Sequence, residues 1–303
     1  MSDVQLQPIV LSSGSQSLQT LSITLLKPDR LITTEELLTL ELPSDLDRTQ
    51  PVLLYGRAPL WFYAYLGERL RNFPWVAFFD IHLQGCVVVS SQSSTAPSVG
   101  DVISLTFNRT PAPAILIGGP PNSGKSVLAN TLRVSLGARR PEWQLYLHRA
   151  NWDGEGNYLY EMGDRQLAAQ LKQYNKRPLH RHPEADRLLS KYFCDRAQDT
   201  YHIRQVVDLA LVDVGGKPEA VKLPVVEQCT HCIIISRDPS QVQDWLDLCQ
   251  GLIPIAVIHS VLEDKLEVLR TEPYLEIVAG RWERDQMRTA PNVLVETILQ
   301  ELS

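Results

Sequence analysis

The sequence has no uninterrupted apolar run of the roughly 20 residues that a membrane-spanning helix needs. Its first residues, MSDVQLQPIV, contain an early acid and no basic cluster, so we expect no signal peptide. Basic residues are not in excess either, because 29 lysines and arginines stand against 35 aspartates and glutamates. A broad nucleic-acid-binding surface is therefore not expected, although a local basic pocket is compatible with this composition.

Cysteine is scarce, with five residues in 303 and no spacing typical of a disulfide framework. This favours a reducing compartment, and we expect a cytoplasmic protein. The stretch Cys229-Thr-His231-Cys232 contains half of the ligands of a metal site, but no second Cys or His pair follows at finger spacing. We interpret these cysteines as structural, with a metal site as the alternative.

The remaining composition is that of an ordinary globular protein, with 44% hydrophobic and 21% charged residues. The length suggests two domains. Residues 1–19 are rich in Ser and Gln, and we expect them to be loose. The Pro-rich segment 108–114 marks the expected boundary between a first domain at 20–110 and a second at 111–303.

In the first domain, short apolar runs bounded by turn residues predict several strands and few helices. The fold class expected here is a small α+β module. The predicted strands are 21–26, 51–56, 75–80, 86–90 and 100–107, and the predicted helices are 32–42 and 58–72.

In the second domain, apolar strands alternate with helices, which predicts an α/β domain with a mainly parallel sheet covered on both faces. A long, mostly helical region is expected at 164–208. The predicted strands are 114–119, 143–149, 208–216, 231–238, 254–262 and 274–280, and the other predicted helices are 124–137, 239–252 and 290–303.

The segment GGPPNSGKS fits the phosphate-binding pattern G-x-x-x-x-G-K-[ST], between a predicted strand and a predicted helix. Lys125 would reach the β- and γ-phosphates, and Ser126 would ligate Mg²⁺. No [NT]-K-x-D motif for guanine is visible, so ATP is favoured over GTP. The predicted ATP-binding residues are Gly119, Asn122, Ser123, Gly124, Lys125 and Ser126.

The motif requires an acid at the carboxyl end of a buried strand, and Asp213 in LALVDVGG fits this requirement. Asp213 would hold Mg²⁺ directly or through water, as the second metal ligand beside Ser126. Asp213-Val-Gly-Gly216 also matches the D-x-x-G sensor of GTPases, although the match is short. A strand-ending Asp in a turn is the alternative interpretation.

Two further features of the second domain have open interpretations. Asp153 and Glu155, in the glycine-rich loop 148–158, could activate a water or an acceptor hydroxyl, or could belong to a plain acidic turn. A basic cluster could be a solvated surface or a lid that closes on phosphate. The cluster consists of Lys176, Arg177, His180, Arg181, His182 and Arg187.

The first domain contains a long ordered pattern. It begins YGRAPLWFYAYLGERLRN at 55–72 and continues with a strand ending in Asp80, a Val-rich strand and VGDVI at 99–103. It resembles the CRISPR-associated ring nucleases of the Csx-three family over about residues 20–107. The matching residues are Gly56, Arg57, Pro59, Leu60, Trp61, Tyr63, Asp80, Leu83, Gly85, Val87 to Val89 and Val99 to Ile103.

This resemblance implies a ferredoxin-like module that assembles as a symmetric dimer or tetramer. It implies that cyclic tetra-adenylate, the second messenger of type III CRISPR defence, binds in a composite site between subunits. The family hydrolyses this messenger with the help of Mn²⁺ and so switches the antiviral signal off. Some cyanobacterial members resemble this chain in carrying a C-terminal P-loop (AAA-like) domain.

The chain departs from the family pattern at its histidines. Arg71 replaces a His at the end of the helix, His82 replaces an Arg after the strand-ending Asp80, and Ser90-Ser91-Gln92 replaces a His after the Val-rich strand. We assign proton transfer to His82, phosphate binding to Arg71 and orientation of a base or metal binding to Asp80. The lost histidines leave open a weakened nuclease that mainly binds.

The messenger-binding residues expected from the resemblance are Arg57, Trp61, Ser90 and Ser91. Trp61 would stack on adenine, but both Trp61 and Tyr63 could instead be core residues. Likewise, Asp80 could cap a turn and Arg57 could be an ordinary surface residue.

The leading hypothesis is a ring nuclease with an attached ATP-binding domain that regulates the nuclease or processes its products. The first alternative is a P-loop small-molecule kinase or NTPase whose N-terminal module only mediates oligomerisation. The second is a sponge that sequesters the messenger without cutting it. The expected ligands are cyclic tetra-adenylate, ATP and Mg²⁺, with Mn²⁺ for the nuclease.

Overall fold

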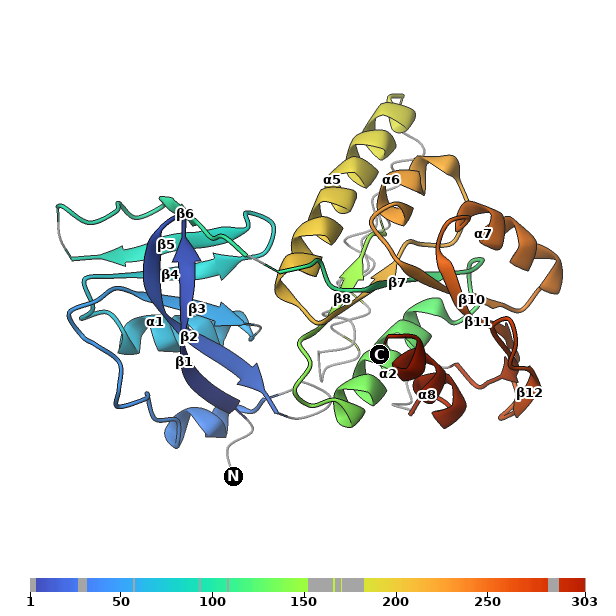
Figure 1. Cartoon of the computed structure of the whole chain (residues 1–303), viewed down its shortest axis with the longest axis horizontal. Helices are drawn as coiled ribbons and strands as arrows, with labels where there is room; N and C mark the ends of the chain where they lie inside the picture. Colours follow the sequence, from blue (N-terminus) through green and yellow to red (C-terminus); the bar gives the residue numbers. More distant parts are fainter. Residues whose placement is uncertain are drawn as a thin grey trace. The chain divides into compact units, whose positions relative to one another are not determined.

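The computed structural model describes residues 4–26, 32–56, 58–92, 94–107, 109–151, 166, 170, 183–282 and 289–302. The chain divides into two compact units, Met1–Thr110 and Pro111–Ser303. In Figure 1 the first unit runs from blue to cyan and the second from green to red. Within the described ranges, no helix has both the length and the apolar character needed to cross a membrane.

One six-stranded sheet, with its strands in chain order, forms the framework of the first unit. The pairs β2–β3 and β3–β4 are parallel and the other pairs are antiparallel, so the sheet is mixed. The strands are β1 (Val4–Ser13), β2 (Gln16–Leu25), β3 (Val52–Gly56), β4 (Trp75–Asp80), β5 (Gly85–Ser91) and β6 (Val102–Ser104). The helices are the 3₁₀ helix η1 (Thr34–Leu38) and α1 (Leu60–Arg69).

This arrangement confirms the predicted α+β class of the first unit. A ferredoxin-like unit has the order βαββαβ, whereas here two strands precede η1 and α1 lies between the parallel strands β3 and β4. The connectivity therefore differs from the ferredoxin-like one that the family resemblance implies.

The expectation that residues 1–19 are loose is wrong. β1 pairs with β2 along ten residues, from Val4 opposite Leu25 to Ser13 opposite Gln16. The Ser and Gln residues lie mostly at exposed or half-buried positions, while Val4 and Leu18 are buried. A strand with one solvated face tolerates polar residues at alternate positions, so composition alone did not reveal the hairpin.

Both faces of the first sheet are packed. Apolar residues of α1 such as Phe62 and Leu66 form one core with Leu21 and Leu54 of the sheet. A second cluster on the sheet contains Leu18, Leu53, Trp75, Ala77, Cys86, Val88 and Leu105. A bridge between Ser12 and Thr106 joins β1 to the segment after β6, so the sheet curls until its two ends meet.

The second unit contains a seven-stranded sheet with the order β12-β13-β11-β10-β7-β9-β8, in which only the β12–β13 pair is antiparallel. This confirms the predicted mainly parallel α/β sheet. The strands are β7 (Ala114–Gly118), β8 (Leu145–Arg149), β9 (Leu209–Asp213), β10 (His231–Ser236), β11 (Ile253–Ser260), β12 (Leu266–Arg270) and β13 (Leu275–Ala279).

Helices cover both faces of this sheet. α2 and α8 contribute to one core with alternate residues of β7, β8 and β9, and α5 and α7 pack on the opposite side, which Figure 1 shows above the strands. The fully buried Trp245 of α7 contacts this second face at Gly118. The helices are α2 (Lys125–Arg139), α5 (Ala185–Val206), α6 (Leu223–Val226), α7 (Val242–Leu248) and α8 (Asn292–Glu301), with 3₁₀ helices η3 (Ala220–Lys222) and η4 (Pro239–Gln241).

Two elements of the second unit differ from the sequence-based expectation. Of the helical region expected at 164–208, α5 covers residues 185–206, and residues 171–182 lie outside the described ranges. β12 was missed because all five of its residues are exposed and show no alternation. Its strand conformation comes from antiparallel pairing with β13 at the edge of the sheet.

Candidate functional site

The phosphate-binding loop connects β7 to α2. Gly119 has φ of +149°, and a Cβ at this position would overlap the carbonyl oxygen of Ile235 on the neighbouring strand. Asn122 and Gly124 also have positive φ, at +61° and +97°. Such residues let a chain turn tightly around an anion at the N-terminus of a helix, here that of α2.

Lys125 opens α2 and is buried, and its Nζ donates a hydrogen bond to the carbonyl of Pro120 at 2.7 Å. The amine is thereby folded back over the loop. A pocket of about 390 Å³ lies beside it, at the lower end of the range for small-molecule sites. Its lining residues are Asn122, Gly124, Lys125, Ser126, Val127, Arg237 and Trp282.

Four of the six predicted ATP-binding residues therefore line this pocket. Of the other two, Ser123 is buried in the loop and Gly119 is packed against β10. Both shape the loop from outside the pocket.

Ser126 and Asp213 meet beside the loop. The Ser126 hydroxyl donates a hydrogen bond of 2.8 Å to Oδ2 of Asp213, and the amide of Gly215 donates one of 3.3 Å to Oδ1. A hydroxyl and a carboxylate are oxygen donors of the kind that Mg²⁺ prefers, with phosphate and water oxygens completing its shell. The residues present therefore fit a magnesium ion bound together with a nucleotide.

The segment after β9 touches the phosphate-binding loop. A Cβ on Gly216 would lie 2.9 Å from Cγ and 3.1 Å from the backbone nitrogen of Pro121. Gly216, the last residue of the D-x-x-G match, thus packs directly against the phosphate-binding loop. A movement of Pro121 in the loop would therefore displace the backbone at Gly216.

Sequence reasoning missed three cations near this centre. Arg149 ends β8, and its Nη1 lies 3.9 Å from Oδ2 of Asp213. Arg237 follows β10 and lines the pocket. Because the carboxyl ends of parallel strands share one edge of a sheet, the strand-end positions of both arginines could have revealed them.

The third cation, Lys222 at the end of η3, had no such signal. It is 2% exposed, its amine donates to the carbonyl of Lys217, and the rings of Trp245 and Phe193 lie 5.6 and 5.9 Å from it. Burial lowers the pKa of Lys222 to about 8, opposed by Glu219, while Lys125 lowers it and Asp213 raises it. The charge of Lys222 therefore interacts with the charges of Lys125 and Asp213 beside the loop.

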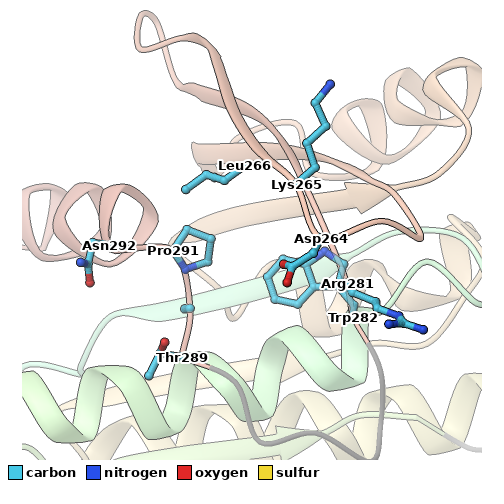
Figure 2. A pocket seen from close by; sticks show the side chains of 10 residues that line it. Asp264, Lys265, Leu266, Arg281, Trp282, Thr289, Pro291 and Asn292 are labelled. Atoms are coloured by element: carbon cyan, nitrogen blue, oxygen red, sulfur yellow. The ribbon is translucent and has the colours of Figure 1, made fainter.

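A second pocket, of about 300 Å³, adjoins the first, because Trp282 lines both. Figure 2 shows its walls: the segments after β11 and β13 on one side and Thr289 to Asn292 on the other. The Trp282 Nε1 donates a hydrogen bond of 2.9 Å to the carbonyl of Ala279, which fixes the indole. The lining residues are Asp264, Lys265, Leu266, Gly280, Arg281, Trp282, Thr289, Ala290, Pro291 and Asn292.

Several residues singled out in the sequence lie outside the described ranges. These are Asp153, Glu155, Lys176, Arg177, His180, Arg181 and His182 in the second unit, and Arg57 in the first. Of the basic cluster, Arg187 is described: it is exposed on α5 and forms an ion pair of 2.9 Å with Glu184.

The Cys229 and Cys232 thiols are buried, and burial raises the pKa of Cys229 to about 12, which keeps that thiol protonated. Across the described part of the chain, no group of three or more His, Cys, Asp or Glu side chains is placed to hold a metal.

In the first unit, Asp80 ends β4 and closes the turn to β5. Its Oδ1 accepts hydrogen bonds from the amides of His82 at 2.8 Å and Leu83 at 3.1 Å. Asp80 therefore caps the turn, and the exposed His82 lies directly beside it. The cap leaves Oδ2 outside these bonds, so the structural role does not exclude a chemical one.

Arg71 lies at the other end of β4. In the register of β4 and β5, Trp75 faces Ser91 and Asp80 faces Gly85, so the Ser90–Ser91 end is remote from Asp80. The Gln92 side chain donates to the carbonyl of Arg71 at 2.8 Å, which fixes Arg71 at the Ser91 end. Six strand residues span roughly 17 Å. Within one chain, Arg71 does not approach Asp80 and His82.

Arg71 is also engaged locally: it is 63% exposed and forms an ion pair of 2.7 Å with Glu68. The predicted residues thus fall into two groups, Asp80 and His82 at one sheet edge and Arg71, Ser90 and Ser91 at the other.

Trp61 lies at the same edge of the sheet as Asp80. β3 and β4 are parallel, and α1 begins shortly after the carboxyl end of β3, so its first turn lies at the Asp80 edge. Trp61 is 38% exposed, and Leu60 and Leu83 are exposed too. Tyr63 packs on Phe78 and donates to the carbonyl of Gly56 at 2.7 Å, so it is a packing residue. Of the two aromatic candidates, Trp61 is the accessible one.

Three solved structures are similar to parts of the chain. A GTPase in apo form from Pyrococcus abyssi is 16% identical with a TM-score of 0.33, covering 48% of this chain and 66% of that protein. The septum site-determining protein MinD complexed with Mg-ADP from Pyrococcus horikoshii OT3 is 13% identical with a TM-score of 0.34, covering 61% and 77%. The signal recognition particle receptor FtsY from Elizabethkingia anophelis is 11% identical with a TM-score of 0.27, covering 51% and 52%. The chain thus spans less than two thirds of the first and third of these proteins.

Residues 25–104 match the family described as CRISPR-associated protein (Cas_csx3), which is the Csx-three family that the sequence pattern resembles. The match begins at the last residue of β2 and ends at the last residue of β6. Residues 25–104 are thus similar to the CRISPR-associated Csx-three family, and the mainly parallel α/β unit that follows contains the phosphate-binding loop.

Proposed function

We propose that the protein is a ring nuclease that binds and linearises cyclic tetra-adenylate, with an ATP-binding P-loop domain that regulates it or processes its products. The observation that carries the first part is the family match at 25–104 together with Asp80 and His82 side by side at an accessible sheet edge. Exposed Trp61 at the same edge suits stacking on a base.

The separation of Arg71 from Asp80 favours a site built from two copies of the chain. A messenger with four phosphates needs several cations, and the Arg71 edge of one copy could supply them to the Asp80 edge of another. A symmetric dimer or tetramer would repeat this arrangement. Ser90 and Ser91 would then contribute hydroxyl donors from the Arg71 edge.

Cleavage of an RNA-type phosphodiester requires a deprotonated 2′-hydroxyl, a stabilised phosphorane and a protonated leaving oxygen. His82 would transfer the proton, with its backbone held by Asp80 through the 2.8 Å hydrogen bond. Arg71 of another copy would stabilise the phosphorane charge. When bound, Mn²⁺ would supply Lewis-acid stabilisation of the same charge, and Asp80 is the residue that would hold it.

For the second unit, the loop, Lys125 and the Ser126–Asp213 pair support binding of a nucleoside triphosphate with Mg²⁺. When bound, Mg²⁺ would neutralise phosphate charge. Phosphates in the first pocket would leave the nucleoside to extend past Trp282 into the second pocket. We assign ATP as the nucleotide, and a competition between ATP and GTP tests this assignment.

One assay tests the whole proposal. The purified full-length protein is incubated with radiolabelled cyclic tetra-adenylate, with and without ATP and Mn²⁺, and the products are resolved. Linear fragments support the nuclease. Retention of intact messenger contradicts the nuclease and supports the sponge.

If the messenger is neither cut nor retained, the alternative of a P-loop kinase or NTPase with a non-catalytic N-terminal module is favoured. Its supporting observation is that Asp80 has a structural role as a turn cap. ATP turnover measured in the same sample then decides whether the second unit is active by itself.

A further inference from the structure

Arg149, Asp213 and Ile117 lie in one row across three neighbouring strands. Asp213 is the register partner of Ile117 on β7 and of Arg149 on β8. Alternate residues of these strands, such as Leu147 and Leu211, belong to the core formed with α2. Because side chains alternate along a strand, Arg149 and Asp213 lie on this same α2 face, where the phosphate-binding loop begins.

The side chain of Arg149 is 5% exposed and that of Asp213 is 0% exposed. The distance of 3.9 Å between Nη1 of Arg149 and Oδ2 of Asp213 is longer than a hydrogen bond. The same Oδ2 accepts the hydroxyl of Ser126 at 2.8 Å. Asp213 thus lies close enough to Arg149 to offset its charge, while it accepts hydrogen bonds from Ser126 and Gly215.

Three buried cations lie near this carboxylate. Among the described buried residues at this edge, Lys125, Arg149 and Lys222 are cations and Asp213 is the acid. The positive charge of these residues attracts an anion. A polyphosphate is the anion that the adjoining loop is shaped to hold.

We propose that Arg149 is the phosphate-binding arginine of the second unit, contacting the terminal phosphate of a bound nucleoside triphosphate from within the same chain. The proposal rests on nucleotide binding at the loop, as proposed above. The planar guanidinium presents several N–H donors in a fixed fork that matches phosphate oxygens in two-point contacts. Arg149 does not line the pocket beside the loop, so its side chain would have to move past Asp213 to reach the phosphate.

The position of Asp213 also links cation binding at Ser126 to the position of Arg149. If Asp213 and Ser126 held a nucleotide-bound cation, the cation would take up part of the carboxylate charge, and the attraction between Asp213 and Arg149 would weaken. Arg149 would then be available for the terminal phosphate. A nucleoside diphosphate lacks that phosphate, so Arg149 would distinguish the triphosphate from the diphosphate.

The test measures binding of ADP and of the non-hydrolysable β,γ-imido analogue of ATP to the full-length protein by calorimetry. The variants are Arg149→Gln, Arg149→Lys and, as a control, Arg140→Gln, which removes an exposed arginine 3.7 Å from Glu142. We expect Arg149→Gln to lose about tenfold or more in affinity for the triphosphate analogue, with ADP affinity changed less than threefold. Arg140→Gln should bind both as the wild type does.

Equal losses for both nucleotides, or no loss, would overturn the proposal. Arg149→Lys provides the second measurement if the glutamine variant does not fold: it keeps the charge but loses the fork, and a selective loss for the triphosphate analogue is again expected. Unchanged selectivity in the lysine variant would then count against Arg149. Failure of the wild type to bind either nucleotide would instead refute nucleotide binding itself.

Discussion

The hydroxyl of Ser126 donates a hydrogen bond of 2.8 Å to Oδ2 of Asp213, although the two residues are 87 positions apart in the sequence. Their pairing joins the first turn of α2 to the carboxyl end of β9. It places the two oxygen donors that a nucleotide-bound Mg²⁺ needs on one side of the phosphate-binding loop.

Replacing Asp213 by Asn should weaken the dependence of nucleotide binding on Mg²⁺. The amide keeps the size of the side chain but removes the charge, so we expect Mg²⁺ to improve affinity for the ATP analogue at least tenfold less than in the wild type. Titrations with and without Mg²⁺ measure this. Asp247→Asn, an exposed change on α7, is the control, and an identical Mg²⁺ effect in Asp213→Asn would contradict the assignment.

Lys125→Ala should abolish ATP turnover and lower ATP affinity by about 10- to 100-fold, because a charge-assisted contact to phosphate is lost. The matched control is Lys191→Ala, which removes an exposed lysine that pairs with Asp195 on α5. Turnover is followed by phosphate release. If the Lys125 variant hydrolyses ATP at the wild-type rate, the loop does not bind the nucleotide.

The buried Lys222 should make stability depend on pH. Its folded-state pKa of about 8 lies below the ordinary value of 10.5, so the folded state releases this proton first as pH rises. The destabilisation is fully present below about pH 8 and is relieved between pH 8 and 10.5. Relative to Lys222→Met, the wild type should therefore gain up to about 3 kcal/mol across this window.

Urea denaturation of the wild type and Lys222→Met at pH 7, 8.5 and 10 checks this expectation. The difference between the two proteins is the relevant quantity, because other groups also titrate in this range. A constant difference across the three pH values would show that Lys222 is not buried as a cation.

Asp80→Asn should reduce cleavage of cyclic tetra-adenylate by tenfold or more if the carboxylate takes part in the chemistry. The matched control is Asp101→Asn, because Asp101 also accepts a backbone hydrogen bond in a turn, from Ser98 at 2.8 Å. Loss of a turn cap alone would affect both variants similarly, and thermal unfolding shows whether it does. Equal cleavage rates in both variants would confine Asp80 to a structural role.

The composite site predicts complementation between two inactive variants. Arg71→Ala and Asp80→Asn damage opposite edges of the sheet, so a mixed dimer would contain one site with both residues intact. Co-expression of the two variants should restore about a quarter of the wild-type cleavage rate, since random pairing leaves one site in four intact. No recovery in verified mixed oligomers would contradict a site shared in this way.

Much of the phosphate site could be predicted from the sequence. Gly119, Lys125 and Ser126 belong to one contiguous loop, whose spacing is imposed by local backbone geometry. Asp213 could be predicted because an acid after four buried apolar residues marks the end of an internal strand. The α+β and α/β classes followed from the same local periodicities.

The tertiary structure decided what depends on strand order and register. Only the sheet order places β8 beside β9 and brings Arg149 to Asp213, and only the meeting of three segments forms the pocket beside Trp282. The same applies to the hairpin of β1, to the edge strand β12 and to the distance between Arg71 and Asp80. Local sequence determines which residues form a strand, but pairing between strands is a long-range choice made by burial and hydrogen bonding across the whole sheet.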